Sequence, residues 1–159
     1  MIAIGDRIPS ATLVKVTPQG PEAVDAADYF AGRRVALFAV PGAFTPTCSA
    51  KHLPSFVERM GDLKAHGVDE VACTATNDAF VMDAWAKQTG ADGITMLADG
   101  NGQFAAALGL TADSSKFGLG TRSRRYAMLV DNGVVAQVHV EAPGEFKVSS
   151  ADHLLANMA

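Results

Sequence analysis

The residues best suited to chemistry lie in the nine-residue segment 41–49, P-G-A-F-T-P-T-C-S. This segment places Cys48 where a helix is expected to begin, directly after an apolar run typical of a buried strand. Unpaired backbone amides and the helix dipole favour negative charge at such a position. Because the thiolate is the nucleophilic form of cysteine, the sequence indicates an activated thiol at Cys48.

Two neighbours of Cys48 suit a reaction at a peroxide O–O bond. Thr45 lies three residues earlier, where its hydroxyl can approach both the sulfur and a substrate oxygen. Pro41 can shield the sulfur from water and brings no competing amide proton. A nearby guanidinium would stabilise the thiolate and donate to the peroxide oxygens as charge develops. These parts predict an in-line displacement that leaves Cys48 as a sulfenic acid, with no metal or organic cofactor.

Other uses of the thiol find less support. A thiol-disulfide oxidoreductase needs a Cys-x-x-Cys pair, and the position three before Cys48 is Thr45. His52 lies one helical turn after Cys48, as a Cys-His hydrolase would want, but no acidic third group accompanies it, so we interpret His52 as peripheral. A redox sensor that uses oxidation of Cys48 as a signal stays open, as a rival or as an added role.

Length and composition set the remaining limits. The 159 residues predict one domain spanning 1–159, and the net charge of −4 with no long basic stretch argues against nucleic-acid binding. The longest apolar run, 35–40, is too short to cross a bilayer. No signal-peptide pattern opens the sequence, so we expect a soluble, cytoplasmic protein. Cys48 and Cys73 are 25 residues apart and the four histidines are scattered, which argues against a metal site.

The pattern of apolar residues and turns predicts the elements that position the thiol. We expect strands at 12–17, 34–40, 68–75, 94–97, 126–130 and 134–140, and helices at 25–30, from 47 or 48 to 67, after 77 or 78, at 103–108 and at 150–157. Asn132-Gly133 predicts a tight hairpin between the last two strands. Segment 111–123 is weakly patterned, and we expect a functional loop there. Parallel early strands, a hairpin and a closing helix predict an α/β, thioredoxin-like fold with a central mixed sheet flanked by helices.

Pro41, Thr45 and Cys48 form P-x-x-x-T-x-x-C, and on this motif the chain resembles the peroxiredoxins of the atypical type II/type V group. The resemblance extends through V-A-C at 71–73, N-D-A-F at 77–80, R-R-Y-A-M at 124–128 and V-S-S-A at 148–151. It therefore covers nearly the whole chain. It implies a peroxidase that reduces hydrogen peroxide and organic hydroperoxides and serves antioxidant defence.

The resemblance also implies roles for individual residues. Cys48 attacks the peroxide, Thr45 positions it, Pro41 shields the thiol, and an arginine at the start of a later strand completes the site. We choose Arg125 because it directly precedes the strand at 126–130. Arg124 would point to the opposite face of that strand, and Arg122 is the weaker alternative.

The resemblance leaves the reductant and the second cysteine open. Cys73 lies in an apolar strand, where cysteine packs as a small hydrophobe, yet plant type II members have a cysteine at this place that is sometimes proposed as the resolving thiol. If Cys73 is structural, an external thiol recycles Cys48, and the resemblance implies glutathione with glutaredoxin, or thioredoxin. It also implies a homodimer, for which Phe44 and Phe80 are candidate contact residues.

Overall fold

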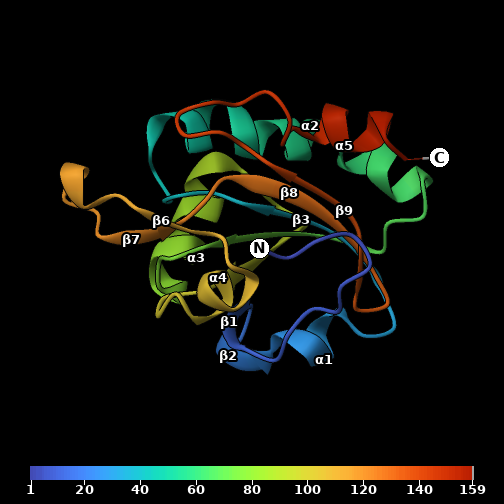
Figure 1. The fold of residues 1–159 in the computed structure, drawn as a ribbon, viewed down its shortest axis with the longest axis horizontal. Helices are drawn as coiled ribbons and strands as arrows, with labels where there is room; N and C mark the ends of the chain where they lie inside the picture. Colours follow the sequence, from blue (N-terminus) through green and yellow to red (C-terminus); the bar gives the residue numbers. More distant parts are fainter. Residues whose placement is uncertain (159) are drawn as a thin grey trace.

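A seven-stranded mixed sheet forms the centre of the computed structural model, which describes residues 1–158 (Figure 1). Its strand order is β2-β1-β5-β4-β3-β8-β9. The strands are β1 (Thr12–Thr17), β2 (Gly20–Asp25), β3 (Arg34–Ala39), β4 (Glu70–Ala75), β5 (Ile94–Ala98), β8 (Tyr126–Asp131) and β9 (Val134–Val140). β3, β4 and β5 are parallel, and every other pairing in this sheet is antiparallel. The expected mixed sheet is confirmed.

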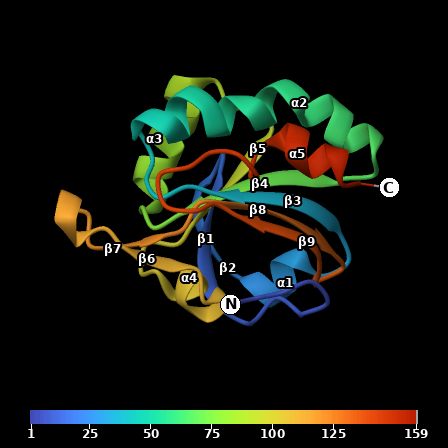
Figure 2. The same cartoon turned by 45° about the horizontal axis from the view of Figure 1, so that its top comes forward.

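Helices cover both faces of the sheet, as Figure 2 shows. Helices α2 (Leu53–Ala65), α3 (Ala79–Thr89) and α5 (Ala151–Ala156) lie on one face, and α1 (Ala26–Phe30) and α4 (Gln103–Leu108) lie on the other. Each face carries its own cluster of buried apolar side chains. Strand β3 lies between β4 and β8, and five of its six residues are fully buried. Its unbroken apolar run is therefore explained by cover on both sides.

Local signals in the sequence set several element boundaries. Asp25, Asp78 and Ser150 cap the N-termini of α1, α3 and α5, each accepting a hydrogen bond from a backbone amide of the first turn. Asn132 and Gly133 have φ angles of 49° and 77°, as the predicted tight hairpin between β8 and β9 requires.

Three features differ from the expectations. Strand β2 forms a hairpin with β1, whereas only a turn was expected there. The strand was missed because Pro21 weakens its pattern. Segment 111–123 is a small hairpin, β6 (Thr111–Asp113) with β7 (Thr121–Ser123), around the 3-10 turn η2 (Ser115–Phe117). The helix after β3 begins with a π-helical turn, η1 (Cys48–His52), before it continues as α2.

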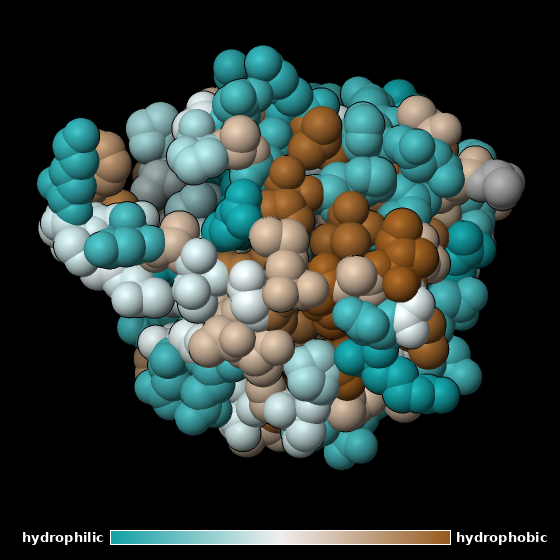
Figure 3. Space-filling model, viewed as in Figure 1, coloured by the Kyte–Doolittle hydropathy of each residue, from teal (hydrophilic) through white to brown (hydrophobic). Residues whose placement is uncertain are grey.

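Strand β9 is one edge of the sheet, and hydrophobic side chains gather over it in Figure 3. Val138 and Val140 of this strand are only half-buried. Among residues 1–158, no helix combines the length and the apolar composition that a membrane span requires.

Candidate active site

Cys48 begins the π-helical turn η1, directly beyond the end of β3. Its side chain is fully buried, and the backbone N–H of Leu53 donates to its carbonyl oxygen, five residues away. A π turn is wider than an α turn and is frequently found at functional sites. Cys48 and His52 are the first and last residues of this turn, and both are fully buried.

The hydroxyl of Thr45 lies between two acceptors. Its Oγ1 is 2.8 Å from the sulfur of Cys48 and 2.7 Å from the carbonyl oxygen of Gly42. A hydroxyl has one proton to donate, so it can serve only one of these acceptors at a time. The hydroxyl can therefore accept from a Cys48 thiol while it donates to Gly42, or turn its proton toward a thiolate.

Arg125 lies directly before β8 in the chain, and its side chain reaches the sulfur of Cys48 from there. Its Nη2 donates to the sulfur of Cys48 at 3.1 Å, and its Nη1 donates to Nδ1 of His52 at 2.9 Å. A guanidinium has only donors. Because it faces the sulfur with one nitrogen and is held by an imidazole with the other, its direction at the site is fixed.

His52 is fully buried, and its partners determine its protonation. Nδ1 must accept because Arg125 can only donate, so the ring proton sits on Nε2, which donates to the carbonyl oxygen of Ser149 at 2.8 Å. Phe38 and Phe146 pack against the ring at centroid distances of 5.0 and 5.1 Å. Burial, followed by the charge of Arg125, lowers the pKa of His52 to about 3. Interpreting His52 as peripheral was wrong, because it is the acceptor that holds the arginine.

The loop from Pro41 to Thr47 is fixed from the neighbouring strand. The side-chain oxygen of Asn77, which follows β4, accepts a hydrogen bond from the backbone N–H of Ala43 at 2.9 Å. The next residue, Phe44, has a φ angle of 66°, a conformation that costs energy for a residue with a Cβ. The loop geometry is therefore imposed by its anchors, and the side chain of Phe44 is left 46% exposed.

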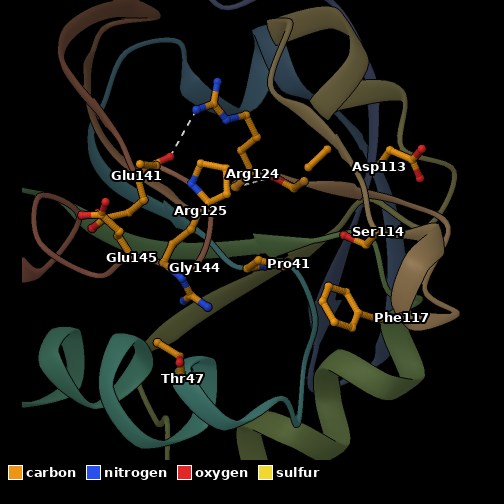
Figure 4. A pocket seen from close by; sticks show the side chains of 14 residues that line it. Pro41, Thr47, Asp113, Ser114, Phe117, Arg124, Arg125, Glu141, Gly144 and Glu145 are labelled. Atoms are coloured by element: carbon orange, nitrogen blue, oxygen red, sulfur yellow. Dashed lines mark hydrogen bonds between the residues drawn. The ribbon is translucent and has the colours of Figure 1, made fainter.

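A cavity of about 410 Å³ opens beside the thiol, and Pro41, Thr47 and Arg125 form its inner wall (Figure 4). Its outer wall comes from the β6–β7 hairpin and from segment 141–145, with Phe117 among the apolar residues that line it. Cys48 itself does not line the cavity, but Arg125, which donates to its sulfur, does.

The structure separates the three candidate arginines. Arg124 donates from Nη2 to the carbonyl oxygen of Glu141 at 3.1 Å, on the side of the cavity away from Thr47 (Figure 4). Arg122 donates from Nε to the carbonyl oxygen of Leu119 at 2.9 Å. Of the three, Arg125 is the one that donates to the sulfur.

Cys73 lies on β4, opposite Phe38 of β3, and is fully buried in the same apolar cluster as Cys48. Both cysteines are free thiols. Burial, followed by the nearby charge of Cys48, raises the pKa of Cys73 well above its usual value. Cys73 is therefore held as a neutral thiol. Across residues 1–158, no group of three or more His, Cys, Asp or Glu side chains is placed to hold a metal ion.

Comparison with known proteins identifies the relatives of the chain. Residues 3–155 match the family model described as Redoxin. The chain is 52% identical to peroxiredoxin-2E-2, chloroplastic, of Oryza sativa subsp. japonica, covering 97% of this chain and 71% of that protein. It is 46% identical to peroxiredoxin-2B of Arabidopsis thaliana, over 97% and 96%. A crystal structure of reduced Prx3 from Vibrio vulnificus in complex with H₂O₂ superposes with a TM-score of 0.96 at 51% identity, covering all of both chains.

Proposed function

The chain belongs to the peroxiredoxins of the redoxin family and is a thiol peroxidase, and on that premise we propose that Cys48 is its peroxidatic nucleophile. Thr45 and Arg125 are its hydrogen-bond donors, and Pro41 limits the access of water. The observation that carries this proposal is the convergence of two donors on one buried sulfur, at 2.8 and 3.1 Å.

The reaction is a displacement at oxygen. The thiolate of Cys48 attacks the terminal oxygen of a hydroperoxide, an S–O bond forms, and the O–O bond breaks. The leaving oxygen takes the electron pair and a proton, and departs as water or an alcohol, while Cys48 becomes a sulfenic acid. Negative charge grows on the peroxide oxygens during this step, and Arg125 and Thr45 are placed to donate to it.

An external thiol completes the cycle. It attacks the sulfenic sulfur of Cys48 and releases water, which gives a mixed disulfide, and a second thiol then restores Cys48 by exchange. The burial and the raised pKa of Cys73 support an external reductant over an internal one. We assign this role to glutathione with glutaredoxin, or to thioredoxin.

The cavity beside the thiol supports organic hydroperoxides as substrates in addition to hydrogen peroxide. Pro41 and Arg125 belong both to its inner wall and to the site that we propose around Cys48. Its outer wall includes the apolar ring of Phe117. The hydrocarbon part of a substrate can occupy this space while its terminal oxygen reaches Cys48.

A second copy of the chain is the partner that we propose for the surface around the site. The side chains of Phe44, Phe80, Phe117 and Leu119 are exposed. Phe44 lies in the loop that leads to Cys48, and Phe117 lines the cavity. Exposed aromatic side chains in such number favour a protein contact, and a homodimer would cover them. We also propose a cytoplasmic setting, where reducing conditions keep free thiols such as Cys48 and Cys73 reduced.

Intact-mass measurement tests the proposal. One equivalent of hydrogen peroxide is added without reductant to the wild type, Cys48→Ser and Cys73→Ser. A gain of one oxygen that needs Cys48 and not Cys73 supports the one-cysteine cycle. Loss of two hydrogens that Cys73→Ser abolishes would make Cys73 the resolving thiol, and a wild type no faster than free cysteine would overturn the role of Cys48.

A further inference from the structure

The direction of the Arg125 guanidinium depends on a chain of contacts that leads away from the substrate. Its Nη1 donates to Nδ1 of His52, and Nε2 of His52 donates to the carbonyl oxygen of Ser149. Ser149 lies in segment 142–150, which forms no helix or strand. The position of the imidazole therefore depends on what holds this segment in place.

Glu141, which follows β9 directly, holds that segment. Its Oε2 accepts hydrogen bonds from the backbone N–H groups of Lys147, Val148 and Ser149, each at 2.8 Å, and from the hydroxyl of Ser149 at 2.7 Å. The residue is only 4% exposed. Successive N–H groups that point at one oxygen make a nest suited to an anion.

The carboxylate is ionised in this nest. Burial alone would raise the pKa of Glu141, but the hydrogen bonds from the backbone of 147–149 and from the Ser149 hydroxyl outweigh it and hold the pKa below its usual value. An ionised acceptor makes stronger hydrogen bonds than a neutral one. The ionised carboxylate of Glu141 therefore holds segment 142–150 in place through its hydrogen bonds to the backbone of 147–149.

Both ends of Glu141 are connected to the site. The backbone N–H of Glu141 donates to the carbonyl oxygen of Arg125 at 2.9 Å. Its side chain holds the N–H of Ser149, and the carbonyl of the same Ser149 accepts from His52. Glu141 therefore binds the backbone of Arg125 directly. Through Ser149 it also positions the imidazole of His52, which directs the guanidinium of Arg125.

We propose that Glu141 is a positioning residue of the peroxidase site, acting through Ser149 and His52 to aim the guanidinium of Arg125 at the reacting oxygens. This inference rests on the proposed role of Arg125. Glu141 makes neither of the two hydrogen bonds to the sulfur, and it lines the outer wall of the cavity, which hydrogen peroxide at the sulfur does not need to fill. Its effect is confined to steps in which the direction of the guanidinium matters, above all the cleavage of the O–O bond.

Glu141→Gln tests this role because it keeps the size of the side chain and removes its charge. We expect the second-order rate constant for oxidation of Cys48 by hydrogen peroxide to fall about 10- to 100-fold, the range that small misplacements of catalytic groups produce. Alkylation of Cys48 by iodoacetamide develops no charge on an oxygen. Measured at a pH at which Cys48 is ionised in both proteins, its rate should change less than about threefold by the same argument. Glu58→Gln, an exposed change on α2, is the matched control and should leave both rates unaltered.

A double-mutant cycle with Arg125→Lys separates this inference from the function on which it depends. If Glu141 acts through Arg125, Glu141→Gln should have little further effect on peroxide oxidation once Arg125 is replaced. Additive effects, or equal losses in the peroxide and iodoacetamide reactions, would overturn the inference. If Arg125→Lys alone leaves the peroxide rate unchanged, the proposed role of Arg125 fails instead.

Two further measurements keep the test decisive. Should Glu141→Gln not fold, Glu141→Asp, which keeps the charge but withdraws it by one methylene, enters the same cycle. ¹⁵N NMR of the wild type at neutral pH should show His52 with a proton on Nε2 and none on Nδ1. In the Glu141 variant the chemical shifts of these two ring nitrogens should change. An unchanged His52 spectrum in a variant that has lost peroxide activity would contradict the proposed path.

Discussion

The indole of Trp85 in α3 donates from Nε1 to the hydroxyl of Ser49 at 2.9 Å. Ser49 is the residue after Cys48 and belongs to the same π-helical turn. Trp85 is fully buried and is the one tryptophan of the chain. The turn that carries the nucleophile is therefore attached to a spectroscopic reporter on a different helix.

Trp85 fluorescence should report the oxidation of Cys48. Because the indole hydrogen bond ends on the turn that bears the sulfur, formation of a sulfenic acid should change the emission in a single phase whose rate rises linearly with peroxide concentration. Stopped-flow fluorescence measures this rate. Cys48→Ser should give no change on addition of peroxide, and Ser49→Ala should shift the resting emission, whereas Ser10→Ala, at the distant Asp25 contact, should not. A full signal in Cys48→Ser would show that Trp85 senses something else.

The free energy of unfolding should depend on pH through His52. Its pKa in the folded protein is about 3, below the unfolded value of 6.5, so the unfolded chain binds the additional proton. The stability that comes from burying His52 as a neutral ring is complete above pH 6.5 and is lost as the pH falls toward 3. Between pH 7 and 5 the loss should be about 2 kcal/mol.

Urea unfolding of the wild type and His52→Gln checks this dependence. The lowered pKa of His139, caused by burial and then by His153, acts in the same direction in both proteins and cancels in the difference. The difference in stability between the two proteins should therefore shrink as the pH is lowered from 7 to 5. A difference that stays constant over this range would mean that His52 is not buried as a neutral group.

The hydroxyl of Thr45 should be needed for the peroxide step. Thr45→Val keeps the shape of the side chain but removes the donor that lies 2.8 Å from the sulfur, and we expect the second-order rate constant with hydrogen peroxide to fall about 100-fold. Thr45→Ser keeps the donor and should stay within about fivefold of the wild type on the same argument. Competition with a peroxidase of known rate measures both constants. A loss as large in Thr45→Ser as in Thr45→Val would contradict the prediction, because Thr45→Ser keeps the hydroxyl.

Cys73 should matter for stability and not for turnover. Cys73→Ser puts a hydroxyl into a fully buried apolar site, and the free energy of unfolding should fall by about 1–3 kcal/mol. Cys73→Ala avoids the buried hydroxyl and should cost less. Steady-state turnover with a saturating thiol reductant should match the wild type in both variants at a temperature where both are folded. A turnover defect shared by both variants would indicate a resolving thiol.

The sequence predicts the central elements well because their signals are local. The apolar run of β3, the caps Asp78 and Ser150 and the Asn132-Gly133 hairpin each lie within a few residues of the feature that they determine. The two strands of the 111–123 hairpin have three residues each, too few for a pattern of alternation to appear.

The site divides in the same way. Thr45 and Cys48 lie together in one motif, and Arg125 could be selected by its place before a strand. The role of His52 could not be read from the sequence, because its partners Arg125 and Ser149 are 73 and 97 residues away. Its place one turn after Cys48 does not show what it contacts, and only the folded chain brings His52, Arg125 and Ser149 together.

The strand order also determines when the partners of the thiol come together as the chain is made. Cys48 follows β3, whereas Arg125 precedes β8, the antiparallel neighbour that joins β3 from the second half of the chain. A ribosome therefore releases the nucleophile before the guanidinium that donates to it, and a chain without β8 lacks this donor. The peroxide site that we propose is therefore complete only when the second half of the chain has joined the sheet.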